Sequence, residues 1–147
     1  MRLGFDKVTA YALNAMNRLV HAPPEDGWIP VGRIAAECEL PEAVLRKVLT
    51  RLAHAGLVTG TQGKGYTVAA RGRNSTILDI LRAMDGSELD REGCFTREGP
   101  CEFEARCPLR AACGEIRGFL RGRLGAIALS GMPVDPAGIP ICFRRPA

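Results

Sequence analysis

Three cysteines, Cys94, Cys101 and Cys107, are the residues whose type and spacing most clearly predict chemistry. Six residues separate the first two and five the last two, in an acidic segment without apolar periodicity, so we do not expect thiols of a hydrophobic core. Zinc sites favour cysteine pairs two to four residues apart, and this segment has none. The wider spacing favours an iron–sulfur cluster, whose several irons bind thiolates, with the three sulfurs converging in space. Zinc, and haem bound through Cys107-Pro108, stay open as weaker alternatives.

The cellular compartment decides how the six cysteines are interpreted. Residues 1–7 lack the apolar segment of a signal peptide, and no run approaches the roughly 18 apolar residues of a membrane span. We therefore expect a cytoplasmic protein without a membrane partner. Because disulfides are rare in the cytoplasm, the cysteines should be core residues, metal ligands or redox-active thiols.

Three helices are predicted within residues 1–54. Apolar residues at three- and four-residue steps, among them Phe5 and Val8, predict an amphipathic helix over residues 5–19. A helix of about two turns follows over 30–37, and a longer helix covers 41–54, with Pro41 at its first position. The last two helices are joined by only a few residues, which is typical of a helix-turn-helix.

The longer helix is expected to be basic on its outer face. Its apolar residues form one buried stripe, which leaves Arg46, Lys47 and Arg51 outward. On the second helix of a helix-turn-helix such a face reads the major groove of DNA, whereas lysines and arginines nearby hold phosphates. The predicted DNA contacts are Arg33, Pro41, Glu42, Ala43, Arg46, Lys47, Arg51 and Lys64.

A β-hairpin should follow directly. Strand-like runs at 57–59 and 66–68 flank the glycine-rich stretch 60–65, and a hairpin after a helix-turn-helix makes a winged helix. Lys64 at the tip of this wing suits a phosphate backbone. Residues 1–73 carry ten Lys and Arg against six Asp and Glu, a net +4, whereas residues 74–147 carry ten against ten. A polyanion-binding surface is therefore expected in the first half.

The second half is predicted to hold a cysteine loop and a long helix. Thr76 and Asp79 fit a capping box, which starts a helix that runs to about Met84. Residues 85–113 show no clear periodicity, and a long helix is expected from Glu115 to about Ser130, with few partners in its own chain. The fold class is mainly α with a small β-hairpin wing. The expected divisions are a winged helix-turn-helix DNA-binding domain (1–73), a cysteine-cluster loop with a dimerisation helix (74–130) and a flexible tail (131–147).

Short motifs along residues 1–130 resemble, in the same order, the bacterial winged-helix iron–sulfur regulators IscR, NsrR and RirA. The resemblance implies a homodimer that reads a palindromic DNA operator, with the long helices crossing between subunits. It also implies that Cys94, Cys101 and Cys107 ligate a 2Fe–2S or 4Fe–4S cluster, whose loss to nitric oxide, oxidants or iron shortage changes DNA affinity. The motifs are Met1-Arg-Leu3, Tyr11-Ala-Leu13, Ile34-Ala-Ala-Glu37, Leu45-Arg-Lys-Val-Leu-Thr-Arg-Leu52, Ala55-Gly-Leu-Val58, Gly65-Tyr66, Thr76-Ile-Leu-Asp79 and Cys107-Pro-Leu109.

The chain departs from the family pattern at several positions. Arg110 and Ala10 stand where relatives carry a histidine or an aspartate as fourth cluster ligand, which leaves Asp6, Cys113 or an exogenous ligand as candidates. Glu39 replaces a turn glycine, which would cost about 1 kcal/mol if its φ is positive. Arg46 replaces a frequent glutamate, and a bidentate donor there favours guanine over cytosine.

We therefore predict a DNA-binding transcriptional regulator, a repressor, that senses redox state, nitric oxide or iron through its cluster. No nucleophile–base pair, phosphate loop or histidine-based catalytic pattern is present, so no enzyme activity is expected. One alternative is a regulator without iron that senses oxidants through its thiols. Another is a winged helix that contacts protein instead of DNA.

Overall fold

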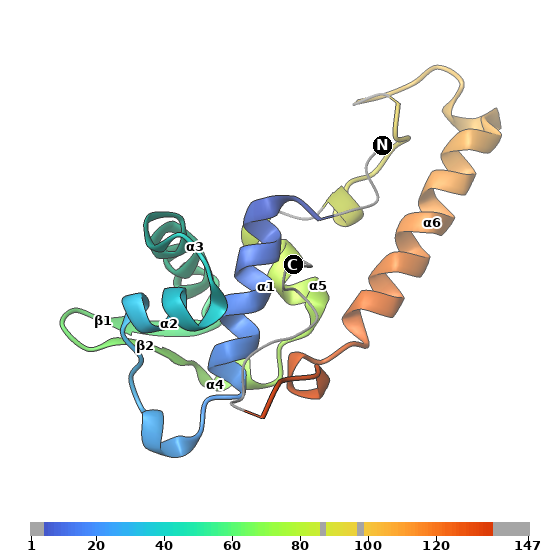
Figure 1. Cartoon of the computed structure of the whole chain (residues 1–147). Coiled ribbons are helices and arrows are strands. Elements are labelled where there is room, and N and C mark those ends of the chain that lie inside the picture. The colour runs from blue at the N-terminus through green and yellow to red at the C-terminus, as the bar shows by residue number, and fades with distance from the viewer. Residues whose placement is uncertain (1–4, 86–87, 97–98, 137–147) are drawn as a thin grey trace.

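The computed structural model describes residues 5–85, 88–96 and 99–136. Figure 1 shows two parts, a body that ends in the wing β1–β2 and an arm formed by α6, which stands off on the other side. The body comprises α1–α5 with β1 and β2, and the arm comprises α6 with the cysteine loop, residues 88–107. In chain order the elements are α1 (Lys7–Val20), η1 (Pro24–Asp26), α2 (Val31–Cys38), α3 (Glu42–His54), β1 (Val58–Thr61), β2 (Gly65–Val68), α4 (Ala70–Arg73), α5 (Ile77–Asp85), η2 (Glu88–Asp90), η3 (Glu104–Arg106), α6 (Pro108–Gly125) and η4 (Leu129–Gly131).

The body is organised around α1. This helix contacts α2, α3, α5 and β2, and its start is capped by Asp6, whose side chain accepts a hydrogen bond of 2.6 Å from the Thr9 amide. Phe5 and Val8, expected on its apolar face, are exposed instead (46% and 37%), because the packed face begins one turn further on. That face is completely buried and consists of Ala12, Leu13, Ala15, Met16 and Leu19.

The helix-turn-helix is formed by α2 and α3. Pro41 is the N-cap of α3 rather than its first residue, and the stripe that faces α1 and α5 is buried at Leu45, Val48, Leu49 and Leu52. Glu39, between the helices, has φ 56° and ψ 45° and is the one non-glycine residue with positive φ in the described part of the chain. A left-handed residue at the end of a helix is usually glycine, so the turn carries the strain that the sequence predicted.

The wing is a two-stranded antiparallel sheet in which Val58 pairs with Val68 and Thr61 with Gly65. Ile29 extends it, because Ile29 and Tyr66 exchange two backbone hydrogen bonds of 2.8 Å. Gly65 has φ 109°, and a Cβ there would stand 2.2 Å from the Ile29 carbonyl oxygen. Only glycine permits this close approach, which holds the start of β2, next to the hairpin turn, against Ile29.

The arm differs from the prediction at both ends of its helix. α6 begins at Pro108, not Glu115, with proline in the first turn, where its missing amide is tolerated. It ends at Gly125, because the next residues return to the body: Ala128 bridges to Thr76, and Leu129 is fully buried in the core. The predicted capping box of α5 is confirmed, since the Asp79 amide donates to Thr76 and the Thr76 amide donates to the Asp79 carboxylate.

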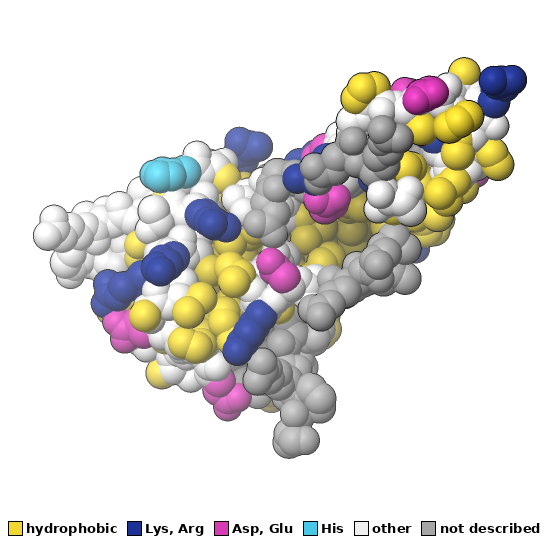
Figure 2. Space-filling model, turned by 90° about the horizontal axis from the view of Figure 1, so that it is seen from above, with side chains coloured by type: hydrophobic (Ala, Val, Ile, Leu, Met, Phe, Trp, Pro, Cys, Tyr) yellow, Lys and Arg dark blue, Asp and Glu magenta, His cyan; other side chains and the backbone are white. Residues whose placement is uncertain are grey.

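The surface of α6 is apolar over much of its length. Figure 2 shows hydrophobic side chains along the arm, and Leu109, Ile116 and Phe119 are 48%, 42% and 67% exposed. None of the described helices combines the length and hydropathy of a membrane span. Of the predicted tail, residues 137–147 lie outside the described part of the chain, as do residues 1–3 of the opening motif.

Candidate DNA-binding face and cysteine loop

The outer face of α3 carries most of the predicted DNA contacts. Pro41, Glu42, Ala43, Arg46 and Lys47 are all exposed on the first two turns of this helix. Arg46 is 61% exposed and forms an ion pair with Glu42 one turn earlier, an arrangement that holds the guanidinium along the helix surface. The structure thus brings five of the eight predicted contacts together on one exposed face.

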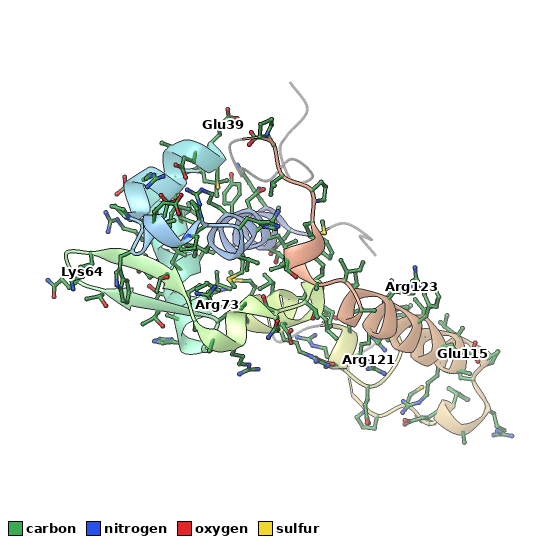
Figure 3. All side chains as sticks on the ribbon, turned by 90° about the horizontal axis from the view of Figure 1, so that it is seen from below. Glu39, Lys64, Arg73, Glu115, Arg121 and Arg123 are labelled. Carbon is green, nitrogen blue, oxygen red and sulfur yellow. The ribbon has the colours of Figure 1, made fainter. Side chains whose placement is uncertain are left out.

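The wing lies beside this face. A groove of about 600 Å³ runs between α3 and the hairpin, and Arg46, Thr50, His54, Lys64 and Tyr66 are among the residues that line it. Figure 3 shows Lys64 at the end of the wing, far from the α6 end marked by Glu115. A helix face and a wing that share one groove can contact adjacent parts of a DNA duplex.

Two side chains that were predicted to contact DNA are bound by other residues of the chain. Arg51 donates a hydrogen bond of 2.9 Å to the Met84 carbonyl, which connects α3 with the last turn of α5. Arg33 lies between two carboxylates, 2.8 Å from Glu37 and 3.0 Å from Asp26, and the bonds to these carboxylates raise its pKa. Both arginines are exposed, but each already has a structural partner.

A buried arginine, Arg18, joins α1 to the helix-turn-helix. Its side chain is 3% exposed and lies 2.6 Å from Glu37 and 2.9 Å from Asp26. Burial lowers the pKa of Arg18, but the two carboxylates outweigh it and leave the pKa above its ordinary value. The hydrogen bond from Arg18 lowers the pKa of Asp26. Burial raises the pKa of Glu37, yet the bonds from Arg18 and Arg33 leave it below the ordinary value. The network therefore fixes α2 against α1.

The three predicted cluster ligands are spread along the cysteine loop. Cys94, Cys101 and Cys107 are each half-buried, and Cys107 is the residue that precedes the first turn of α6. Within the described residues no three His, Cys, Asp or Glu side chains form a group able to hold a metal ion. The expected convergence of the three sulfurs is therefore not seen in this structure. Three thiols are suitable ligands for an iron–sulfur cluster, but in the described structure they are not close enough together to form its binding site.

The candidate fourth ligands have other partners. The Asp6 carboxylate caps α1, and Cys113 is 1% exposed, with its sulfur accepting a hydrogen bond of 3.4 Å from the Phe95 amide. Arg110, at the position where relatives carry a histidine, forms an ion pair with Glu104. Neither candidate points to an assembled four-ligand site.

Arginines of α6 hold the first part of the cysteine loop. Arg117 donates to the Gly93 carbonyl and Arg121, one turn later, donates to the Leu89 carbonyl. Arg82 of α5 binds Asp90 with two hydrogen bonds of 2.7 and 2.8 Å. The loop is thus attached to both neighbouring helices before the first cysteine is reached.

A sequence model of the Rrf2 family, described as iron-dependent transcriptional regulators, matches residues 5–133. The chain belongs to the Rrf2 family. This membership confirms the family resemblance and the winged-helix fold class, and it makes the chain an Rrf2-family transcriptional regulator.

Individual Rrf2 relatives are distant in sequence. The transcriptional repressor NsrR of Streptomyces coelicolor is 26% identical over 136 residues, which cover 90% of this chain and 89% of the relative. CymR (YrzC), the global cysteine regulator of B. subtilis, has a similar structure, with a TM-score of 0.68, 26% identity, and coverage of 88% of this chain and 94% of CymR. T. potens IscR has a TM-score of 0.64 and 23% identity, with coverage of 87% and 84%, so it supports the fold alone.

Reasoning from the sequence missed the structural arginines of this Rrf2 chain. Arg18, Arg117 and Arg121 contact residues between 8 and 32 positions away, and no local pattern marks them. Arginines four apart on a helix, as at 117 and 121, indicate only a shared face. The partners of Arg117 and Arg121 can be identified only from the position of the cysteine loop on α6.

Proposed function

We propose that this Rrf2 regulator binds an operator in double-stranded DNA through the outer face of α3 and the wing. The observation that carries the proposal is the exposed Arg46 and Lys47 on the second helix of the helix-turn-helix, beside a groove that continues to Lys64. Pro41, Glu42 and Ala43 lie at the start of the same helix, where backbone and side chains come closest to base edges. Arg33 and Arg51 contribute by holding α2 and α3 in place.

To test this proposal, a DNA sequence that the full-length protein binds is first selected from a random library. In fluorescence anisotropy, Arg46→Gln with Lys47→Gln should weaken binding to this sequence by about 100-fold, because each lost charged contact costs about 1–3 kcal/mol. Arg91→Gln with Arg106→Gln removes the same two charges from exposed positions of the cysteine loop and should leave the affinity within about twofold. Selection that enriches no sequence, or equal losses in both variants, would contradict the proposal.

We further propose that a second copy of the chain covers the apolar face of α6. Leu109, Ile116 and Phe119 are exposed, and helix positions 109 and 116 differ by seven residues, so they lie on one side. A C2 dimer formed there would place two α3 helices on a palindromic operator. Phe119→Asp should give monomers in sedimentation experiments, whereas Gly114→Asp, which places the same charge in open space on the opposite side of α6, should remain dimeric. A dimer that survives Phe119→Asp rejects this face as the interface.

For sensing, we propose an iron–sulfur cluster, 2Fe–2S or 4Fe–4S, on Cys94, Cys101 and Cys107. Three half-buried thiols in one loop, and a family described as iron-dependent, support it. Cluster binding requires the loop to bring these thiols together, and the loop lies between α5 and the proposed dimer helix. An anaerobic visible spectrum with iron and sulfide counts tests the proposal, and Cys101→Ser should abolish the absorption. Operator affinity with and without the cluster then tests its regulatory role, and equal affinities reject that role.

A second candidate is a thiol-based regulator without iron. The separation of the three thiols and the similarity to CymR, named as a cysteine regulator, favour it. A colourless protein without iron after anaerobic purification, whose operator binding responds to oxidants, would select this candidate over the cluster.

A further inference from the structure

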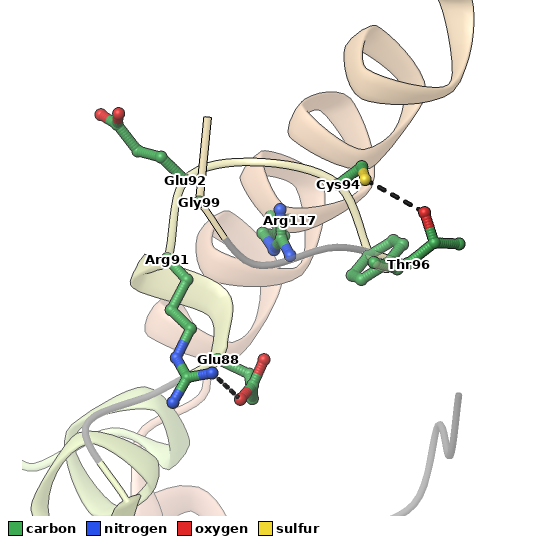
Figure 4. Close-up of a pocket in the computed structure, with 8 residues that line it drawn as sticks. Glu88, Arg91, Glu92, Cys94, Thr96, Gly99 and Arg117 are labelled. Atoms are coloured by element: carbon green, nitrogen blue, oxygen red, sulfur yellow. Dashed lines mark hydrogen bonds and ion pairs between the residues drawn. The ribbon is translucent and has the colours of Figure 1, made fainter. Parts of the chain in front are cut away.

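A hollow of about 430 Å³ lies beneath the first part of the cysteine loop. Figure 4 shows it between η2 and α6, with Arg117 near its centre and Cys94 at its edge. Its volume is within the range of small-molecule sites, which extends from roughly 300 to 1,000 Å³. The hollow shares no lining residue with the groove beside α3, and the proposed DNA binding does not require it.

Arg117 is a buried cation without an anionic partner in the part of the chain that the structure describes. Its side chain is 4% exposed, and among the described residues no carboxylate pairs with it. The guanidinium carbon lies 4.4 Å from the centre of the Phe95 ring, one terminal nitrogen donates to the Gly93 carbonyl, and Nε has no hydrogen-bond partner. Burying an unpaired charge is costly, so an anion that enters the hollow would be stabilised beside Arg117.

The other charged residues of the hollow do not supply that anion. The Glu88 carboxylate is already bound by Arg91 at 2.8 Å, and Figure 4 shows the Glu92 carboxylate pointing away from Cys94. Within the described part of the chain no carboxylate occupies the Arg117 site, so an anion from solution can bind there.

Cys94 places a nucleophile at the same hollow. Its sulfur lies 3.2 Å from the Thr96 hydroxyl, and the side chain is half-buried and lines the hollow together with Arg117. A small molecule whose carboxylate binds Arg117 would thus have its remaining atoms next to a thiol. A thiol attacks a disulfide most efficiently when the disulfide is held beside it.

We propose that the hollow binds a small carboxylate-bearing disulfide, and that Cys94 reacts with it to form a mixed disulfide. The Cys94 thiolate, after losing its proton to solvent, attacks one sulfur of R–S–S–R. A bond forms between Cys94 Sγ and that sulfur, the original S–S bond breaks, and R–S⁻ leaves and takes up a proton. The small disulfide is reduced and Cys94 is oxidised. The reaction does not depend on DNA binding or on a cluster, although a cluster on Cys94 would block it.

The test uses reduced, chelator-treated full-length protein and three disulfides with the same carbon spacing. These are dithiodipropionate, hydroxyethyl disulfide and cystamine, whose ends are anionic, neutral and cationic. Mass spectrometry of peptides gives the rate at Cys94, with Cys101 and Cys107 of the same molecules as internal references. Relative to those references, Cys94 should react about tenfold faster with dithiodipropionate than with cystamine, since a charge-assisted hydrogen bond is worth about 1.4 kcal/mol or more.

Matched variants assign the preference to Arg117. Arg117→Met should remove it and Arg117→Lys should keep part of it. Arg121→Met, which loses a similar hydrogen bond to a loop carbonyl, should leave it unchanged. If Arg117→Met does not fold, the comparison of three cysteines in the wild-type protein decides alone. A carboxylate preference equal at all three cysteines, or one that survives Arg117→Met, overturns the proposal.

Discussion

The body and the arm differ in how much of their apolar surface the chain covers for itself. The hydrophobic core draws on α1, α2, α3, α5 and the wing, and Leu13, Ile34 and Leu49 are fully buried in it. In α6 the described structure buries Cys113 and Arg117, while large apolar residues stay exposed. The body is thus stabilised by apolar burial within one chain, whereas the arm is held by hydrogen bonds from arginines and leaves apolar side chains exposed.

The largest expected effect comes from deleting apolar atoms in the two parts. Leu13→Ala, in the body, should lower the free energy of unfolding by about 3 kcal/mol, since it leaves a cavity in a packed core. Phe119→Ala, on the arm, should change it by less than about 0.5 kcal/mol when protein concentration is low enough to keep the chain monomeric. Urea unfolding measures both. Similar losses from the two variants would show that the arm shares the body's core.

A second, smaller effect concerns the buried arginine of the body. Arg18→Met should lower the free energy of unfolding by about 2 kcal/mol at pH 7, because Glu37 and Asp26 lose their shared donor. Both carboxylates have lowered pKa values in the folded protein. Their stabilisation is therefore complete above their ordinary values of 3.8 and 4.5 and is lost as acid protonates them.

The difference between wild type and Arg18→Met should consequently shrink as the pH falls from 7 to about 3. Arg82→Gln is the matched control on the arm side, since it breaks the exposed pair with Asp90 and should change unfolding little. A constant difference across this pH range would show that Arg18 acts by packing and not through the two carboxylates.

The smallest expected effect is an increase in stability. Glu39→Gly should raise the free energy of unfolding by about 1 kcal/mol, because glycine adopts the left-handed conformation without the Cβ clash. Glu39→Ala keeps the Cβ and should give no gain. Thermal unfolding of the three proteins checks the ranking, and equal stability of the glycine and alanine variants would show that the turn is not strained.

Local signals made the body predictable. The capping box at Thr76, the glycine-rich wing and the apolar stripe of α3 each depend on residues within a few positions of one another. The strain at Glu39 was predicted from the family resemblance, because relatives usually carry glycine at this position of the turn, and not from a local pattern in this chain. The exposed face of α3 followed directly from its helical period.

The arm was less predictable, because its contacts are distant in sequence. Residues 108–114 lack an apolar period, so the first turns of α6 were missed, although Pro108 is a helix-start signal. Ile127 continues the helical period of α6 but lies beyond its end, in the segment that pairs with Ser75 and Thr76. The hydrogen bond of Arg51 to Met84 and the unpaired burial of Arg117 depend on tertiary packing alone.

The return of Leu129 to the core has a consequence for how this protein could be divided or recombined. A fragment that stops after α5 would keep all the proposed DNA contacts but would lose a fully buried leucine and the backbone pairing at Ser75. The hole left behind would weaken the winged helix itself. Joining this winged helix to the arm of a relative would therefore require that the segment after α6, which contains Leu129, is transferred with it.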